Sequence, residues 1–201
     1  DALNLLYDRQ RKQYQIARQN VQIINRKCHE LKVQIADLRR LQPDEAATQS
    51  LDEAEQAARM YDANAATGNE VLDVVLTEKS LLCEAQRIRL NCVADGTCLA
   101  AIEPGDLYAL FSNLLDQAID AAAQQQNDRR MIDLLVCRRQ GFAVINVIGP
   151  ALSGSQPDHG RRHSYELKVA RRVVQKYSGA MATEPRGELF AVKIVLPLTR
   201  G

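Results

Sequence analysis

The stretch DLYALFSNLLDQAIDAA, Asp106 to Ala122, decides the fold class of this chain. Its apolar residues recur at intervals of three and four, which is typical of a helix packed against a core. These positions are Leu107, Leu110, Phe111, Leu114, Leu115, Ala118, Ile119 and Ala122. Asp106 is predicted to be the N-cap of the helix. We therefore expect one long core helix here.

Helical and strand patterns alternate around this helix. Upstream, Glu70 to Ala85 has a helical pattern, and RIRLNCVAD after it is predicted to be a strand. Downstream, MIDLLVCR and GFAVINVI are predicted to pair as a hairpin through the short Arg139–Gln140 link. The core helix is therefore expected to pack against a sheet.

The C-terminal third continues the alternation. ALSGSQPDHGRR is rich in turn residues and is predicted to be a loop. Tyr165 to Tyr177 is predicted to be a helix, with Gly179 in the usual stop position. ELFAVKIVLPL is predicted to be the last strand, after a turn at Pro185–Gly187. Layers of this kind indicate a two-layer α/β sandwich.

The first forty residues carry a heptad pattern. Apolar residues recur at intervals of three and four, as in a coiled coil or a helical bundle. This seam consists of Tyr14, Ala17, Val21, Ile24, Cys28, Leu31, Ile35 and Leu38. A helix of about 40 residues would be about 60 Å long. Its apolar seam needs a partner, because such a helix is not stable alone in water.

A second, shorter seam follows and completes a helical hairpin. Ser50 and Glu53 form a capping-box pattern at its start. Its apolar positions are Leu51, Ala54, Ala58, Tyr61 and Ala65. Hairpins with open seams pair as four-helix bundles, so we expect a homodimer. The chain is thus predicted to be α+β, with a dimerisation hairpin over 1–68 and an α/β sandwich over 69–201.

Composition excludes several classes of protein. The net charge of +1 and the aromatic content of 4% with no Trp argue against nucleic-acid binding. The five cysteines lack CxxC spacing, which favours reduced thiols over disulfides or zinc. No run of 18 apolar residues is present, and because the sequence begins at Asp1 we expect any membrane segment to lie upstream.

Oxygen-bearing side chains gather along one edge of the core helix. Asn113, Gln117 and Asp120 are spaced by four and three residues, and Asp116 is adjacent. Amide and carboxylate oxygens are the ligands that Mg²⁺ prefers. The alternative interpretation is an ordinary polar face of a helix.

Two further stretches of the sequence contain candidate functional residues. HSYELKVARRVVQKYSG opens a helix after a loop, and helix N-termini bind phosphate, although Glu166 places a negative charge there. In RKCHELKVQIADL, Arg26 to Leu38, His29 lies beside Glu30. A lone histidine in a helix is usually a solvated side chain. The heptad places His29 at position b, just outside the seam, where it would be exposed on a rigid element.

Taken in order, GNEVLDVVLTEKSLLCEAQRIRLNC, DLYALFSNLLDQAIDAA, HSYELKVARRVVQKYSG and LFAVKIVLPL resemble the catalytic domain of sensor histidine kinases. The resemblance is narrower to the bacterial peptide-sensing, or quorum-sensing, subfamily. These kinases carry the ATP-binding fold shared with DNA gyrase, Hsp90 and MutL. HELK is similar to the family's phosphoacceptor box, H-[DE]-x-K.

The resemblance implies roles for individual residues. His29 would be phosphorylated, with Glu30 accepting its proton, and Asn113 and Gln117 would hold Mg²⁺. The positions implied to bind ATP are Asn113, Asp116, Gln117, Asp120, Asn146, His163, Leu167 and Lys168. The implied partners are a second copy of the chain and a response regulator, and the implied location is the cytoplasmic side of a bacterial membrane sensor.

Three positions depart from the family pattern. The family's N box reads N-x-x-x-N, and Gln117 replaces the second asparagine. The G box reads H-G-x-G-L, and Ser164 and Glu166 replace its glycines. Two hypotheses remain open. One is an active kinase that transfers phosphate from ATP to His29 and then to an aspartate. The other is a degenerate, non-enzymatic dimeric signalling module with weak or no ATP binding.

Overall fold

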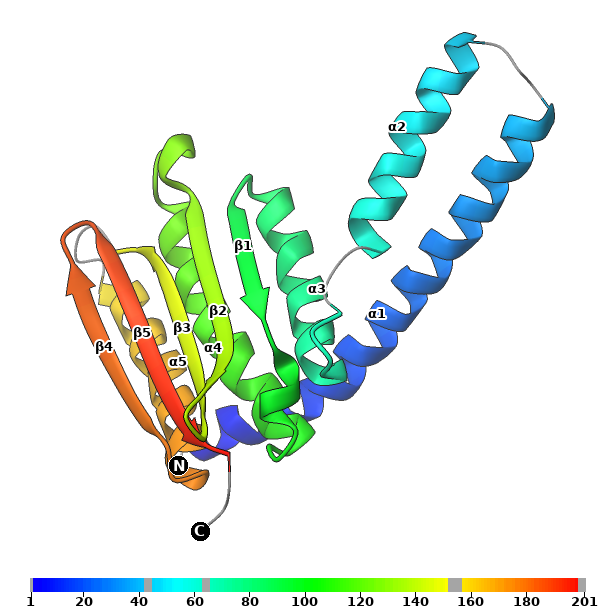
Figure 1. Ribbon diagram of the computed structural model, residues 1–201. Coiled ribbons are helices and arrows are strands. Elements are labelled where there is room, and N and C mark those ends of the chain that lie inside the picture. The colour runs from blue at the N-terminus through cyan, green and yellow to red at the C-terminus, as the bar shows by residue number, and fades with distance from the viewer. Residues whose placement is uncertain (1, 42–44, 63–65, 152–156, 199–201) are drawn as a thin grey trace.

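The computed structural model describes residues 2–41, 45–62, 66–151 and 157–198. A helical hairpin is followed by a five-stranded sheet with three helices on one face, which is the predicted α+β architecture (Figure 1). We call the part from Glu70 to Pro197 the α/β unit. Among the helices described, none combines the length and the apolarity needed to cross a membrane.

The sheet has the strand order β1-β2-β3-β5-β4. Only the β1–β2 pair is parallel, and the other pairs are antiparallel. The predicted hairpin of β2 and β3 is confirmed, and Gln140 and Gly141, both with positive φ, form its turn. The strands are β1 Arg89–Ala94, β2 Met131–Arg139, β3 Phe142–Pro150, β4 Ala180–Arg186 and β5 Leu189–Pro197.

Strand β4 was not predicted from the sequence. AMATEPR has little apolar alternation, and its proline argues against a central strand. The structure places it at the edge of the sheet, where it pairs with β5 alone. An edge position explains the composition, because edge strands carry charges and proline that limit further pairing.

Helices α3 Glu70–Ala85, α4 Pro104–Ala123 and α5 Pro157–Lys176 cover one face of the sheet (Figure 1). Short 3₁₀ helices, Gly96–Leu99 and Asn127–Arg129, precede and follow α4. The apolar stripe predicted for the core helix is buried as expected, from Leu107 to Ala122. Helix α4 therefore forms the centre of the core.

The predicted starts of α4 and α5 are wrong. Helix α4 begins at Pro104 with Glu103 at the N-cap, so Asp106 lies inside the first turn and its side chain is fully buried. Helix α5 begins at Pro157, so residues 157–162 of the predicted loop are helical, and 152–156 lie outside the described residues. Proline is favourable at a first helical position because its missing N–H would have no partner there.

The end of α5 also differs from the prediction. Ser178, not Gly179, adopts the left-handed conformation, with φ of 57°. Gly179 donates its N–H to the Val174 carbonyl at 2.9 Å. A Cβ at position 179 would lie 2.5 Å from Leu196 Cδ2, so this glycine is required by close packing against β5.

The hairpin consists of α1 Ala2–Leu41 and α2 Glu45–Asp62, and α2 begins five residues before the predicted cap at Ser50. Five of the eight predicted seam positions on α1 are buried within the chain. The positions spaced by seven are buried, whereas Leu31 and Leu38 are 49% and 50% exposed. The positions spaced by seven are Tyr7, Tyr14, Val21, Cys28 and Ile35, and Ala17 of the predicted seam is buried as well.

The N-terminal half of α1 packs on the α/β unit rather than on α2. Tyr7, Tyr14 and Val21 belong to the same buried cluster as α3 and α4. The Tyr14 and Tyr108 rings lie 5.7 Å apart between centroids. We call residues Leu3 to Val21 the docking segment. The heptad pattern alone predicted a partner helix at these positions, and the structure places the helical layer of the α/β unit there.

Candidate functional site

A polar cavity of about 600 Å³ lies between α1, α3, α4 and α5. Asn113 and Asp116 enter it from α4, and Glu78 and Lys79 enter from α3. Helix α1 forms the opposite wall. The volume is within the usual range for small-molecule sites. The cavity therefore brings together groups from four helices that are remote in the sequence.

The Asn113 amide is fully engaged by α1 and by its own helix. The Gln10 Nε2 donates to Asn113 Oδ1 at 3.0 Å, and the Asn113 Nδ2 donates back to Gln10 Oε1. The same Nδ2 also donates to the Ala109 carbonyl at 2.5 Å. Since Asn113 is buried, these contacts satisfy a polar group that would otherwise be costly.

Lys79 and Asp116 form an ion pair inside the cavity, with Nζ 2.8 Å from Oδ1. Burial disfavours the charged ammonium, but the Asp116 and Glu78 carboxylates outweigh burial and raise the pKa of Lys79. Burial raises the pKa of Asp116, although Lys79 opposes the shift. The Tyr108 hydroxyl donates to Glu78 Oε2 at 2.9 Å. Lys79 is therefore a charged ammonium held by Asp116 and Glu78 in the wall of the cavity that Asn113 also lines.

The other predicted residues of α4 lie near the cavity but outside its described lining. Gln117 is buried and Asp120 is half-buried, one and two turns after Asn113. Of the predicted polar edge, Asn113 and Asp116 line the cavity, and Gln117 and Asp120 do not.

The predicted G-box residues fall on α5. Glu166 is buried and lines the cavity together with Tyr165. Leu167 packs against the core, and the Lys168 ammonium lies 5.3 Å from the centroid of the Tyr165 ring. The backbone of His163 is helical, but its side chain and that of Ser164 lie outside the described residues.

Asn146 is not brought to this site. Its neighbours Ile145 and Val147 are buried toward the helices, and side chains alternate along a strand. Asn146 therefore lies on the other face of the sheet, between Leu135 and Lys193 on the flanking strands. Its Oδ1 is buried and has no hydrogen-bond partner among the residues that the structure describes.

His29 and Glu30 are exposed on α1, as the heptad predicted. The Lys27 ammonium lies 2.7 Å from Glu30 Oε2, and this contact lowers the pKa of Glu30. Gln13 is the last residue of α1 to line the cavity, and His29 lies sixteen residues (29 − 13) beyond it. At 1.5 Å per residue, this separates His29 from the cavity by about 24 Å along the helix.

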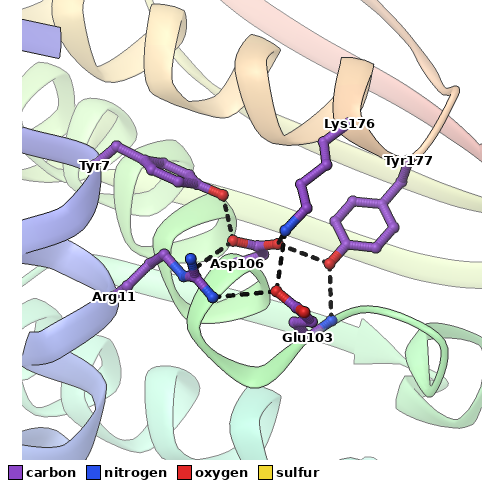
Figure 2. A network of polar contacts seen from close by, with 6 residues as sticks. All are labelled: Tyr7, Arg11, Glu103, Asp106, Lys176 and Tyr177. Atoms are coloured by element: carbon purple, nitrogen blue, oxygen red, sulfur yellow. Dashed lines mark hydrogen bonds and ion pairs between the residues drawn. The ribbon is translucent and has the colours of Figure 1, made fainter. Parts of the chain in front are cut away.

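A buried carboxylate joins α1 to the α/β unit (Figure 2). Asp106 Oδ1 accepts from the Tyr7 hydroxyl, and Oδ2 accepts from Lys176 Nζ at 2.6 Å and from the Tyr177 hydroxyl at 2.7 Å. Arg11 Nε lies 3.3 Å from Oδ1, without hydrogen-bond geometry. Burial alone would raise the pKa of Asp106, but these donors outweigh it and lower the pKa.

Glu103 forms an outer layer of the same network. Its Oε2 lies 3.1 Å from Arg11 Nη2 and 3.0 Å from Lys176 Nζ. Its backbone N–H donates to the Tyr177 hydroxyl at 3.0 Å. The network therefore ties the start of α4 to α1 on one side and to the end of α5 on the other (Figure 2).

The cavity suits a magnesium–phosphate group better than a metal ion alone. Within the described residues, no group of three or more His, Cys, Asp or Glu side chains is arranged to hold a metal ion. Mg²⁺ commonly takes one or two protein oxygens and completes its shell with phosphate and water. Asn113 and Asp116 offer such oxygens, and Lys79 offers a positive charge beside them. The residues present fit Mg²⁺-ATP once Gln10 is displaced from Asn113.

Sequence reasoning missed Gln10, Glu78 and Lys79. A signal existed for the last two, because Glu78 and Lys79 interrupt the otherwise apolar stretch of α3. No local signal pointed to Gln10, since its partner lies 103 positions away.

Comparisons with known proteins agree with this geometry. Residues 102–197 match the family model of the GHKL domain. A crystal structure of the catalytic domain of the histidine kinase ThkA superposes with a TM-score of 0.52, at 15% identity over 67% of this chain and 96% of that one. A second ThkA crystal form gives 0.50 at 15% identity, over 66% and 94%.

A third structure, the Acinetobacter baumannii histidine kinase AdeS, gives a TM-score of 0.49 at 12% identity, over 79% of this chain and 87% of that one. No curated protein sequence matches the chain. The fold is therefore that of the GHKL ATPase domain of histidine kinases, as predicted.

Proposed function

We propose that this chain is the dimerisation and catalytic region of a sensor histidine kinase. It transfers the γ-phosphoryl group of ATP to His29, and from there to an aspartate of a response regulator. The observation that carries the proposal is the placement of Asn113 and Asp116 in a polar cavity on the helical layer of a GHKL-type fold. Oxygen ligands and a buried cation at that place suit a metal-bound polyphosphate.

Each group contributes by position and charge. Mg²⁺ bound with ATP supplies neutralisation of the phosphate charges during transfer. Asn113 and Asp116 would hold the metal, with Gln117 one turn away from Asn113, and Lys79 would compensate negative charge in the same cavity. Glu166 also lines the cavity, and its carboxylate disfavours phosphate that lacks a metal. Catalysis here is chiefly the correct placement of the reactants.

His29 meets the requirements of a phosphoacceptor. It is exposed on a rigid helix, so a nucleotide held by another part of the protein can approach it. A neutral ring nitrogen is a competent nucleophile near neutral pH. Glu30, whose pKa is lowered by Lys27, stays ionised and accepts the ring proton.

The remaining parts of the proposal concern assembly. The exposed part of the α1 seam, with Leu31 and Leu38, offers an apolar stripe to a second copy of the chain. A four-helix bundle would bury this stripe. The resemblance to peptide-sensing kinases carries the further proposal that the chain works on the cytoplasmic side of a bacterial membrane sensor.

A second candidate function is a signalling module without kinase activity. The contact of Gln10 with Asn113 and the presence of Glu166 in the cavity favour it, because both oppose nucleotide binding. In that case the dimer would act through protein contacts alone.

Calorimetry with ATP, with and without Mg²⁺, separates the two candidates. The kinase hypothesis predicts Mg²⁺-dependent binding and transfer of ³²P from γ-labelled ATP to the wild type. A His29→Gln variant should bind nucleotide as the wild type does and take up no label. The kinase hypothesis fails if neither binding nor labelling is detected at millimolar ATP.

A further inference from the structure

The docking segment contacts Asn113, the residue on which the proposed nucleotide binding depends. Gln10 presents a complementary amide to Asn113, and the two side chains hydrogen-bond in both directions. A metal-bound phosphate needs the same Asn113 oxygen. The two arrangements are therefore mutually exclusive at this side chain.

Much of the surface that holds the docking segment is polar and partly exposed. Arg18 Nε pairs with Glu70 Oε1 at 2.8 Å, and both side chains are largely exposed. Arg11 reaches Glu103 at 3.1 Å in a similar setting. Interfaces of this kind within a chain resemble those of transient complexes. These ion pairs are contacts that water can replace, whereas Tyr7, Tyr14 and Val21 pack in the apolar core, so release of the segment also exposes apolar surface.

The buried carboxylate does not bar release of the segment. When α1 leaves, Asp106 loses Tyr7 and Arg11 but keeps Lys176 and the Tyr177 hydroxyl. Both remaining partners come from the α/β unit itself. A buried charge left without partners would oppose release strongly, and Asp106 avoids that state. Asp106 therefore keeps two of its partners when the segment leaves.

The docked arrangement also keeps the proposed reactants apart. The cavity and His29 of the same chain are separated by about 24 Å along one continuous helix. Docking and transfer to that histidine thus require different positions of α1 relative to the α/β unit.

We infer that Leu3–Val21 is an autoinhibitory segment that competes with Mg²⁺-ATP for Asn113 and must undock before nucleotide binds. This inference rests on the proposed function, because it assumes that the cavity takes nucleotide. Only the undocked fraction binds, so the apparent affinity is reduced by that fraction. By reciprocity, bound nucleotide favours the undocked state by the same factor.

Release variants test the inference. Gln10→Ala with Arg11→Ala removes both hydrogen bonds between Gln10 and Asn113 and the ion pairs to Asp106 and Glu103, without changing any residue assigned to nucleotide binding. Gln19→Ala, at an exposed position of the same helix, is the matched control. We expect the double variant to bind Mg²⁺ with the non-hydrolysable analogue AMP-PNP about tenfold more tightly than the wild type. The control should bind as the wild type does.

The possible results separate the inference from the proposed function. Equal affinity of the wild type and the double variant, with both binding, overturns the inference and leaves the proposed function in place. Absence of binding in both proteins at millimolar nucleotide overturns both. Tighter binding by the double variant supports both.

A crosslink that holds the docking segment on the α/β unit is the opposite of the release variants. Cysteines at Arg18 and Glu70 (Arg18→Cys, Glu70→Cys), in a Cys92→Ser background, are joined by a short reducible thiol crosslinker. These two side chains meet outside the polar cavity. The linked protein should lose AMP-PNP binding, and reduction of the crosslink should restore it. Linked and reduced proteins of equal affinity would contradict the competition.

Discussion

Replacement of Asp106 by asparagine should lower the free energy of unfolding by about 3 to 6 kcal/mol. Four donor groups, on Tyr7, Arg11, Lys176 and Tyr177, converge on the two carboxylate oxygens. An asparagine presents one oxygen and one NH₂ group, so two of these donors would face another donor. Hydrogen bonds to charged groups contribute about 1.5 to 3 kcal/mol each, and two are lost.

Thermal unfolding followed by circular dichroism measures this effect. At about 2 to 4 °C per kcal/mol for a chain of this size, the melting temperature should fall by at least about 6 °C. Glu103→Gln is the matched control. Glu103 shares Arg11 and Lys176 with Asp106 but is 55% exposed, so its loss should cost less than about 1 kcal/mol. The reasoning is wrong if the melting temperatures of Asp106→Asn and Glu103→Gln differ by less than about 1 °C.

The same pair of proteins should differ in their response to acid. The pKa of Asp106 is lowered in the folded state, so its stabilisation is present above the unfolded pKa of about 3.9. That stabilisation disappears as the pH falls through the lower, folded pKa. The difference in unfolding free energy between wild type and Asp106→Asn should therefore shrink below about pH 4.

Three further outcomes are expected. Arg130→Ala should lower the free energy of unfolding in urea by about 2 kcal/mol, because the Arg130 guanidinium donates to three backbone carbonyls at the ends of α3 and α4. Arg129→Ala is the control, and because Arg129 is exposed, its loss should cost under about 0.5 kcal/mol. Gly179→Ala should cost about 1 to 3 kcal/mol by the same measurement, because its Cβ would overlap Leu196 Cδ2, and an unchanged midpoint would refute the packing argument. Burial and the bond to Asp106 raise the pKa of Tyr7 to about 12, so its stabilisation is present below about pH 10 and lost as the pH rises toward 12. The stability difference between wild type and Tyr7→Phe should thus narrow over that range, and a constant difference would exclude the role of the hydroxyl.

The elements set by local patterning could be predicted from the sequence. Glu70–Ala85 and the β2–β3 hairpin have the expected type and place, because apolar periodicity and turn residues determine them directly. Strand β4 escaped prediction because its pairing with β5, and not its own composition, makes it a strand. Asp106 was assigned to the wrong role, since a carboxylate near a helix start suggests a cap unless a distant cation claims it.

The candidate site also contains residues that could be predicted from the sequence and residues that could not. The polar edge of α4 was visible from spacing, and Asn113 and Asp116 do line the cavity. The partner of Asn113 was not predicted, because Gln10 lies 103 positions away in the sequence and only tertiary docking brings the two side chains together. Asn146 was assigned by motif similarity, and the alternation of β3 places it on the opposite face of the sheet.

The unbroken course of α1 has a mechanical consequence. One rigid rod carries Gln10 at one end and His29 nineteen residues (29 − 10) further on, with no break between them. At about 100° per residue, their side chains project in directions about 100° apart around the axis. A torque applied to the start of the rod would turn both residues through the same angle. The release of Gln10 from Asn113 and the reorientation of His29 would then be one movement, a rotation of α1 about its axis combined with a shift along it.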